Sequence, residues 1–160
     1  MQAFLRLTDR LAALVRATTV GLAVAMLVAL ALQVLMRYVF GKALSWTEEL
    51  ALGCFTWTML LAISLGVRDA IHVRMDLLVD RLPDRARRVA ERAILLAIAV
   101  FGVFLAWSGG RYLLDTQGMT SAAIGYPIGY LYAAAPVTGA LIALFCAERL
   151  LRSYGQSDAR

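Results

Sequence analysis

The sequence predicts an all-α membrane protein with four transmembrane helices, interfacial amphipathic helices and both termini in the cytoplasm. Of its 160 residues, 61% are hydrophobic and only 17% are charged, whereas soluble domains carry about 25% charged residues. The mean hydropathy is +0.72, and a soluble domain of this size lacks the interior to bury so much apolar surface. These observations disfavour a soluble enzyme, a disordered chain and a disulfide-stapled module. They predict one membrane domain over residues 1–160.

Two elements are expected at the N-terminus: an amphipathic helix over about 3–16 on the membrane surface, and a first span over about 17–36. The apolar positions of the amphipathic helix recur at helical spacing: Phe4, Leu7, Leu11, Leu14 and Val15. Its charged positions fall on the opposite face: Arg6, Asp9, Arg10 and Arg16. A cleavable signal peptide is the alternative for the first apolar run, but the run is too long and no convincing cleavage site follows it.

Three further apolar runs are long enough to cross a bilayer, which takes about 20 helical residues. The spans that they predict cover about 46–69, 90–115 and 124–150. Ser45 and Glu48 have the spacing of a capping box. In that motif the Ser45 side chain caps the helix and Glu48 reaches back to the Ser45 amide, so the second span should begin at Trp46.

The connection between the second and third spans and the two prolines of the last span also carry predictions. Apolar residues at helical spacing predict a further interfacial helix over about 71–82. Pro127 suits the first turn of the last helix. Pro136 should kink that helix within the membrane, where neighbouring groups can satisfy the freed carbonyl.

The distribution of basic residues predicts the orientation. Fifteen of the 16 basic residues are Arg. Thirteen lie before the first span, between the second and third, or after the fourth, and three lie in the remaining segments. Because Lys and Arg are enriched in cytoplasmic loops, both termini should be cytoplasmic. The cations lie between apolar runs rather than on one basic face, so the net charge of +5 is explained by a lipid bilayer and not by nucleic acid.

Cofactors and metals are not expected. Cys54 and Cys146 both fall inside apolar runs, where thiols behave as small hydrophobic groups. The single histidine, His72, cannot supply the ligand pair of a haem or a histidine-containing zinc cluster.

Small residues recur four positions apart in three of the spans, which allows close helix packing. The predicted helix-packing positions are Gly21, Ala25 and Ala29, then Gly102, Ala106 and Gly110, then Gly125, Gly129 and Ala133. Packing within this chain is one interpretation of each lane. The other is that at least one lane faces a partner.

A polar cluster is expected where the first span ends and the second begins. Arg37 should face Glu48 and Glu49 across a short turn, and Gln33 lies one helical turn before Arg37. In one interpretation the glutamates stabilise a helix start and Arg37 reaches to head groups. In the other, an ion pair fixes the hairpin and presents aromatic side chains to another protein. Those side chains are Tyr38, Phe40 and Trp46.

His72 and Asp76 lie one turn apart in the predicted interfacial helix. They form either a polar stripe facing head groups or a contact with a partner. No Asp, Glu, Lys, Arg or His lies centrally in any predicted span, whereas ion and proton carriers usually keep such a residue near the midplane. An accessory subunit is therefore favoured over a membrane anchor of a redox enzyme or a small oligomeric exporter.

Two stretches resemble the small membrane subunit, the DctQ-like family, of tripartite ATP-independent periplasmic (TRAP) transporters. The first is Arg37-Tyr38-x-Phe40 followed by Leu44-Ser45-Trp46-x-Glu48-Glu49-Leu50. The second is Gly66, then His72-Val73-x-Met75-Asp76-Leu77-Leu78, ending at Leu82-Pro83. One departure is Leu52, at a position where the family often has an arginine.

The resemblance implies a specific role. Such subunits join a large multi-span membrane subunit that carries the sodium and substrate sites, in the bacterial inner membrane. A periplasmic solute-binding protein delivers the substrate, commonly an organic acid such as a dicarboxylate or sialic acid. A sodium gradient drives the import. The small subunit is similar to a scaffold that braces the large one, and it is not an enzyme.

Overall fold

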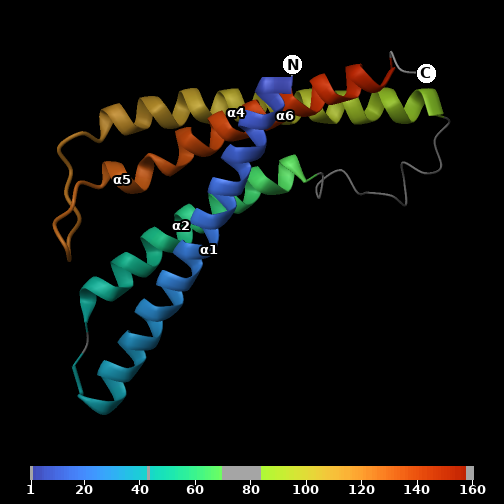
Figure 1. Ribbon diagram of the computed structural model, residues 1–160. Helices are drawn as coiled ribbons and strands as arrows, with labels where there is room; N and C mark the ends of the chain where they lie inside the picture. Colours follow the sequence, from blue (N-terminus) through green and yellow to red (C-terminus); the bar gives the residue numbers. More distant parts are fainter. Residues whose placement is uncertain (1, 43, 70–83, 158–160) are drawn as a thin grey trace.

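The computed structural model describes residues 2–42, 44–69 and 84–157, and its long elements are all helices (Figure 1). These elements are α1 (Gln2–Val39), α2 (Ser45–Arg68), α4 (Asp84–Asp115), the short α5 (Gly129–Tyr132) and α6 (Ala134–Ser157). Among these residues, four helices are long and apolar enough to cross a membrane. The interfacial helix predicted over 71–82 lies outside the described residues.

The four long helices are arranged as two hairpins. α1 packs on α2, α4 packs on α6, and α2 and α6 hold the hairpins together. In Figure 1 the hairpins cross near the beginning of α1 and diverge toward the turns that close them. We call the first region the basic end, where α1 begins and α2 and α6 end, and the second the loop end, where α1 and α4 end. α2 and α6 are thus central, and α1 and α4 are the outer helices.

The apolar core lies between the central helices. One cluster joins Leu61 and Leu65 of α2 to Phe145 of α6, with Ala12 and Val15 of α1. A second cluster is formed by Val67, Leu95, Ile142 and Cys146. Large apolar side chains on α1 and α4 remain exposed, for example Leu27 and Val100. A helix that stays apolar on its outer face is suited to lipid or to another membrane protein.

The N-terminal prediction of two separate elements differs from the structure, because residues 2–39 form one continuous helix. The sequence contains no Pro or Gly between residues 3 and 20, so nothing interrupts the helical hydrogen bonds. The predicted apolar face is also divided. Val15 is buried with Thr8 and Ala12, whereas Leu7 and Leu14 are exposed.

The capping box predicted at Ser45 is not formed. α2 begins at Ser45 rather than Trp46, the N-cap residue is Leu44, and no side chain caps the helix. The Thr47 hydroxyl donates to the Leu44 carbonyl at 2.6 Å. Glu48 does not reach back to Ser45, because its carboxylate accepts a hydrogen bond from Gln33 on α1 instead.

The last span is shorter and more broken than predicted. Residues 124–128 are not helical, and Pro127 lies in an isolated β-bridge with Thr120 instead of in a first helical turn. α5 and α6 are separated at Ala133, three residues before Pro136. Proline has no N–H to donate and its ring clashes with the preceding turn, so the distortion expected at Pro136 takes the form of a break at its N-terminal side.

Candidate functional site

At the loop end, the ion pair expected between Arg37 and Glu48 or Glu49 is absent among the described residues. Gln33 donates from Nε2 to Glu48 Oε1 at 2.7 Å, so a neutral side chain joins α1 to α2. Arg37 lies in the last turn of α1 and is exposed. A cation at a helix C-terminus is favoured by the helix dipole, which explains its position without an acidic partner.

Glu49 holds the loop between α4 and α5 instead. Its carboxylate accepts a hydrogen bond from the Ser121 hydroxyl. It also accepts the Ile124 amide at 3.0 Å and the Ala123 amide at 3.4 Å. A carboxylate with several neutral donors is well satisfied, so Glu49 joins the two hairpins at the loop end and has no need of Arg37.

The aromatic residues expected to face a partner are exposed in the isolated chain. Phe40 is 60% exposed, and Tyr38 and Trp46 are also open to the surroundings. This placement is compatible with partner binding, which stays a prediction. His72 and Asp76, the other predicted contact residues, lie outside the described residues.

The basic end contains a network of charged side chains that sequence reasoning did not find. Arg68 of α2 pairs with Asp9 of α1 and, through Nε, with Glu148 Oε2 of α6 at 3.2 Å. Arg152 Nη2 pairs with Glu148 Oε1 at 2.6 Å and with Asp9 Oδ1 at 3.1 Å. The Glu148 side chain is only 2% exposed. We call these four residues the Asp9–Glu148 network, and it joins α1, α2 and α6.

Further contacts support the network. The Arg68 guanidinium lies 5.7 Å from the centroid of the Phe145 ring, a cation–π geometry. Arg149 Nη1 donates to the Val67 carbonyl at 3.0 Å, which satisfies an otherwise open group at the end of α2. The sequence does contain a signal for part of the network. Glu148 directly follows an apolar run, and Arg152 lies four positions later, which places the two on the same face of a helix.

The predicted small-residue lanes have different surroundings. Gly102 and Ala106 of α4 face α6, where a Cβ at Gly139 would lie 2.4 Å from the Ala106 nitrogen and 2.6 Å from the Gly102 oxygen. Gly139 was missed by the sequence analysis. Added Cβ atoms at Gly21 and Gly110 would meet nothing within 4 Å.

The remaining lane positions also differ, since some are packed against a neighbour and others are exposed or lie in a loop. Ala29 is buried, whereas Ala25 is exposed. Gly125 is not helical and has φ +76°, a left-handed conformation typical of glycine in a turn. Gly129 lies in α5, close to Leu113 of α4. The lane expected at Gly125, Gly129 and Ala133 is therefore wrong, because the first of these belongs to the loop and the last to the break between α5 and α6.

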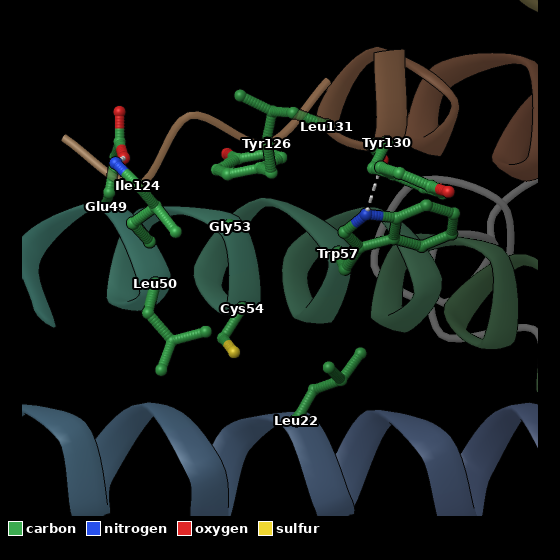
Figure 2. A pocket seen from close by; sticks show the side chains of 10 residues that line it. All are labelled: Leu22, Glu49, Leu50, Gly53, Cys54, Trp57, Ile124, Tyr126, Tyr130 and Leu131. Atoms are coloured by element: carbon green, nitrogen blue, oxygen red, sulfur yellow. Dashed lines mark hydrogen bonds between the residues drawn. The ribbon is translucent and has the colours of Figure 1, made fainter. Parts of the chain in front are cut away.

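An apolar groove of about 370 Å³ lies on α2 between α1 and the loop end of the other hairpin (Figure 2). Its walls include Leu22 of α1, Leu50 and Cys54 of α2, and Tyr126 and Leu131 of the second hairpin. Gly53 has open space where a Cβ would lie. At one end of the groove, the Trp57 indole donates to the Tyr130 carbonyl at 3.0 Å. We call this feature the Gly53 groove.

These features define the class of protein: a helical membrane component with exposed apolar and aromatic side chains. Among residues 2–42, 44–69 and 84–157, no group of three or more His, Cys, Asp or Glu side chains could hold a metal ion. Residues 26–155 match the family model described as tripartite ATP-independent periplasmic transporters, DctQ component. The chain belongs to this family of TRAP transporter components, and it is a transporter subunit and not an enzyme.

Three relatives illustrate the similarity. The sialic acid TRAP transporter small permease protein SiaQ of Vibrio cholerae is 28% identical, over 71% of this chain and 71% of the relative. The C4-dicarboxylate TRAP transporter small permease protein DctQ of Rhodobacter capsulatus is 32% identical, over 64% of this chain and 46% of the relative. The sialic acid TRAP transporter permease protein SiaT of Haemophilus influenzae is 32% identical, over 69% of this chain but only 18% of that longer permease.

Proposed function

We propose that this small permease subunit is a scaffold that braces the large membrane subunit of a sodium-driven TRAP transporter. The observation that carries the proposal is the placement of charge. Asp, Glu, Lys and Arg side chains occupy the ends of the four spans and none lies centrally. The four residues of the Asp9–Glu148 network are used to join helices of this chain. Such a chain is suited to holding a partner in place, since a carrier usually needs polar groups at the midplane.

The relatives support association with the large subunit. In SiaT the matching segment is a small part of a longer permease, which is expected where the two parts work side by side. Membership of the family favours the bacterial inner membrane as the location, and the Arg distribution favours both termini in the cytoplasm. In this orientation the basic end is cytoplasmic and the loop end is periplasmic, on the side where a solute-binding protein delivers its cargo.

The imported solute is an organic acid in this proposal. The relatives' names include C4-dicarboxylate and sialic acid, so related small subunits serve transporters with different substrates. Substrate recognition belongs to the large subunit and the solute-binding protein.

The contact surface that we propose for the large subunit is the exposed cluster of Arg37, Tyr38, Phe40 and Trp46. Aromatic and Arg side chains are those that most often dominate interfaces. The test uses Phe40→Ala, with Phe101→Ala on α4 as the matched control because the two side chains are 60% and 57% exposed. A tagged chain is co-expressed with the large membrane subunit of the same transporter, and the amount that co-purifies is measured.

We expect Phe40→Ala and Arg37→Ala to lower the amount of co-purified large subunit severalfold, while Phe101→Ala leaves it unchanged. Unchanged assembly with both loop-end variants would contradict this surface. Transport by the small subunit alone in liposomes would overturn the bracing role itself.

A further inference from the structure

Thr58 of α2 and Thr138 of α6 carry buried hydroxyl groups that differ from the other hydroxyls of the spans. Neither hydroxyl oxygen is open to solvent, and neither has a hydrogen-bond partner among the described residues. Thr138 as a whole residue is 0% exposed. A hydroxyl without a partner in an apolar environment is costly, so each of the two is expected to find one in the folded protein.

Other hydroxyl side chains of these helices are satisfied by their own helix. They donate to the carbonyl three or four positions earlier, a local bond that serine and threonine often make. This is the arrangement at Thr8, Thr19, Thr56 and Ser64. Thr58 and Thr138 also follow helical carbonyls but do not bond to them, so a partner has to come from another helix.

The two threonines occupy equivalent places on facing helix surfaces. α2 and α6 run in the same direction, and Arg68 of α2 pairs with Glu148 of α6, 80 positions later in the chain. Three, seven and ten residues before this pair lie Leu65, Leu61 and Thr58 on α2 and Phe145, Leu141 and Thr138 on α6. The four apolar residues of the two series belong to one core cluster. Because steps of three and four residues stay on one side of a helix, the register places Thr58 opposite Thr138.

These hydroxyls lie near the middle of the membrane. Thr58 precedes Arg68 by about 15 Å along α2, at 1.5 Å per residue, which is about half of a hydrocarbon core of roughly 30 Å. No water is available at this depth, so polar groups are satisfied by other groups of the protein. A threonine hydroxyl is both a donor and an acceptor, and the one on the facing helix can therefore serve as the partner.

We propose that Thr58 and Thr138 form a polar link between α2 and α6, in which one hydroxyl donates a hydrogen bond to the other in the membrane. Threonine in a helix has two accessible χ1 rotamers, so a side-chain rotation can form the bond within this register. The link fixes the two central helices at mid-membrane, as the Arg68–Glu148 pair does at the basic end. It uses polar groups to join helices of this chain, and it is independent of whether the subunit braces a partner.

The test uses valine, which is close to threonine in shape but has no hydroxyl. Thr58→Val, Thr138→Val and the double variant are unfolded with a denaturing detergent, and their unfolding equilibrium constants are compared with that of the unsubstituted chain. A bond between the two hydroxyls makes the single effects non-additive. Thr56→Val is the matched control, because Thr56 also lies on α2 but donates to the Leu52 carbonyl of its own helix.

We expect each single variant at Thr58 or Thr138 to raise the unfolding constant severalfold, because it leaves the other hydroxyl without a partner. The double variant should be no less stable than either single variant, whereas Thr56→Val combined with Thr138→Val should show additive effects. If the two hydroxyls do not pair, each valine removes an unsatisfied polar group and stabilises the chain, and the two gains add. That result would overturn the proposal.

A second measurement tests the register without relying on stability. The sequence has two cysteines, which Cys54→Ala and Cys146→Ala remove. Thr58→Cys and Thr138→Cys are then introduced together, and the full chain is oxidised in phosphatidylcholine vesicles, with Thr56→Cys and Thr138→Cys as the control pair. A disulfide needs Cβ atoms about 3.5–4.5 Å apart, so we expect it between positions 58 and 138 and not between 56 and 138. Its absence from both pairs, or equal formation in both, would show that the two threonines do not face each other.

Discussion

In the α4–α6 hairpin a glycine lies where the two backbones approach closely, whereas Gly21 and Gly53 of the α1–α2 hairpin face open space. A Cβ at Gly139 would lie 2.4 Å from the Ala106 nitrogen, but Cβ atoms at Gly21 and Gly53 would lie in open space. Small residues at a helix crossing allow close backbone approach and extensive van der Waals contact. The comparison indicates that glycine brings the backbones together in α4–α6, whereas Gly21 and Gly53 of α1–α2 lie away from any neighbouring helix.

The two hairpins are linked differently at their two ends. At the basic end a nearly buried carboxylate, Glu148, is held between Arg68 and Arg152. At the loop end neutral donors from the loop hold Glu49. The link between the hairpins should therefore contribute more to folding stability at the basic end than at the loop end. Variants can measure this link separately from the packing within each hairpin.

The largest effect should follow from Glu148→Gln, which removes the charge shared by Arg68 and Arg152. Breaking a buried ion pair by removing one partner costs about 3–5 kcal/mol. The change in the free energy of unfolding is measured by titrating with a denaturing detergent and monitoring the loss of the helical circular dichroism signal. Asp9→Asn is the control because Asp9 is more exposed, and an exposed pair contributes at most about 1 kcal/mol. Equal losses in the two variants would mean that burial of Glu148 is not what strengthens the link.

Gly139→Ala should have the next largest effect, because the new Cβ meets the α4 backbone and the helices have to separate. Overpacking of this kind typically costs about 1–3 kcal/mol. Gly21→Ala is the counterpart in the other hairpin. It adds a methyl group to open space, and Ala is favoured over Gly within a helix by about 0.5–1 kcal/mol.

The same detergent unfolding assay measures both glycine variants. Opposite signs would support the difference between the hairpins. A destabilising Gly21→Ala would show that α1 is packed more closely than its open surroundings indicate.

Trp57→Phe should destabilise the chain less than Glu148→Gln or Gly139→Ala. It keeps an aromatic ring but removes the hydrogen bond to the Tyr130 carbonyl, which joins α2 to α5. One such bond contributes about 1 kcal/mol. The thermal stability of the detergent-solubilised chain measures the loss. A loss as large as that of Glu148→Gln would contradict a weaker link at the loop end.

Much of the helical framework could be predicted because apolar run length and helical spacing are local properties. Four helices long and apolar enough to cross a membrane are present, and the contact of Gly102 and Ala106 with α6 is the kind of packing that their spacing indicates. The break before Pro136 follows from the covalent structure of proline. Each of these features depends on residues close together in the chain.

Two of the errors, the Arg37 ion pair and the Ser45 capping box, share a cause, which is competition from residues distant in the sequence. Gln33 and Ser121 take the carboxylates that were expected to pair with Arg37 or to cap a helix. The network brings Glu148 together with two distant residues. Arg68 lies 80 positions before Glu148 in the chain, and Asp9 lies 139 positions before it. Spacing rules describe neighbours on one helix, so they contain no information on such partners.

The sequence by itself determined that this chain has four apolar helices, where its charges lie along them and which family it belongs to, because hydropathy and local motifs need no partner to be recognised. Only the tertiary structure decided which charges meet. It places Asp9, Arg68 and Glu148 together at one end and leaves Gly53 without a neighbour at the other. The physical reason is that ion pairing and free volume depend on how the hairpins cross, and that crossing is set by close contact at the small residues and by the buried apolar side chains between α2 and α6.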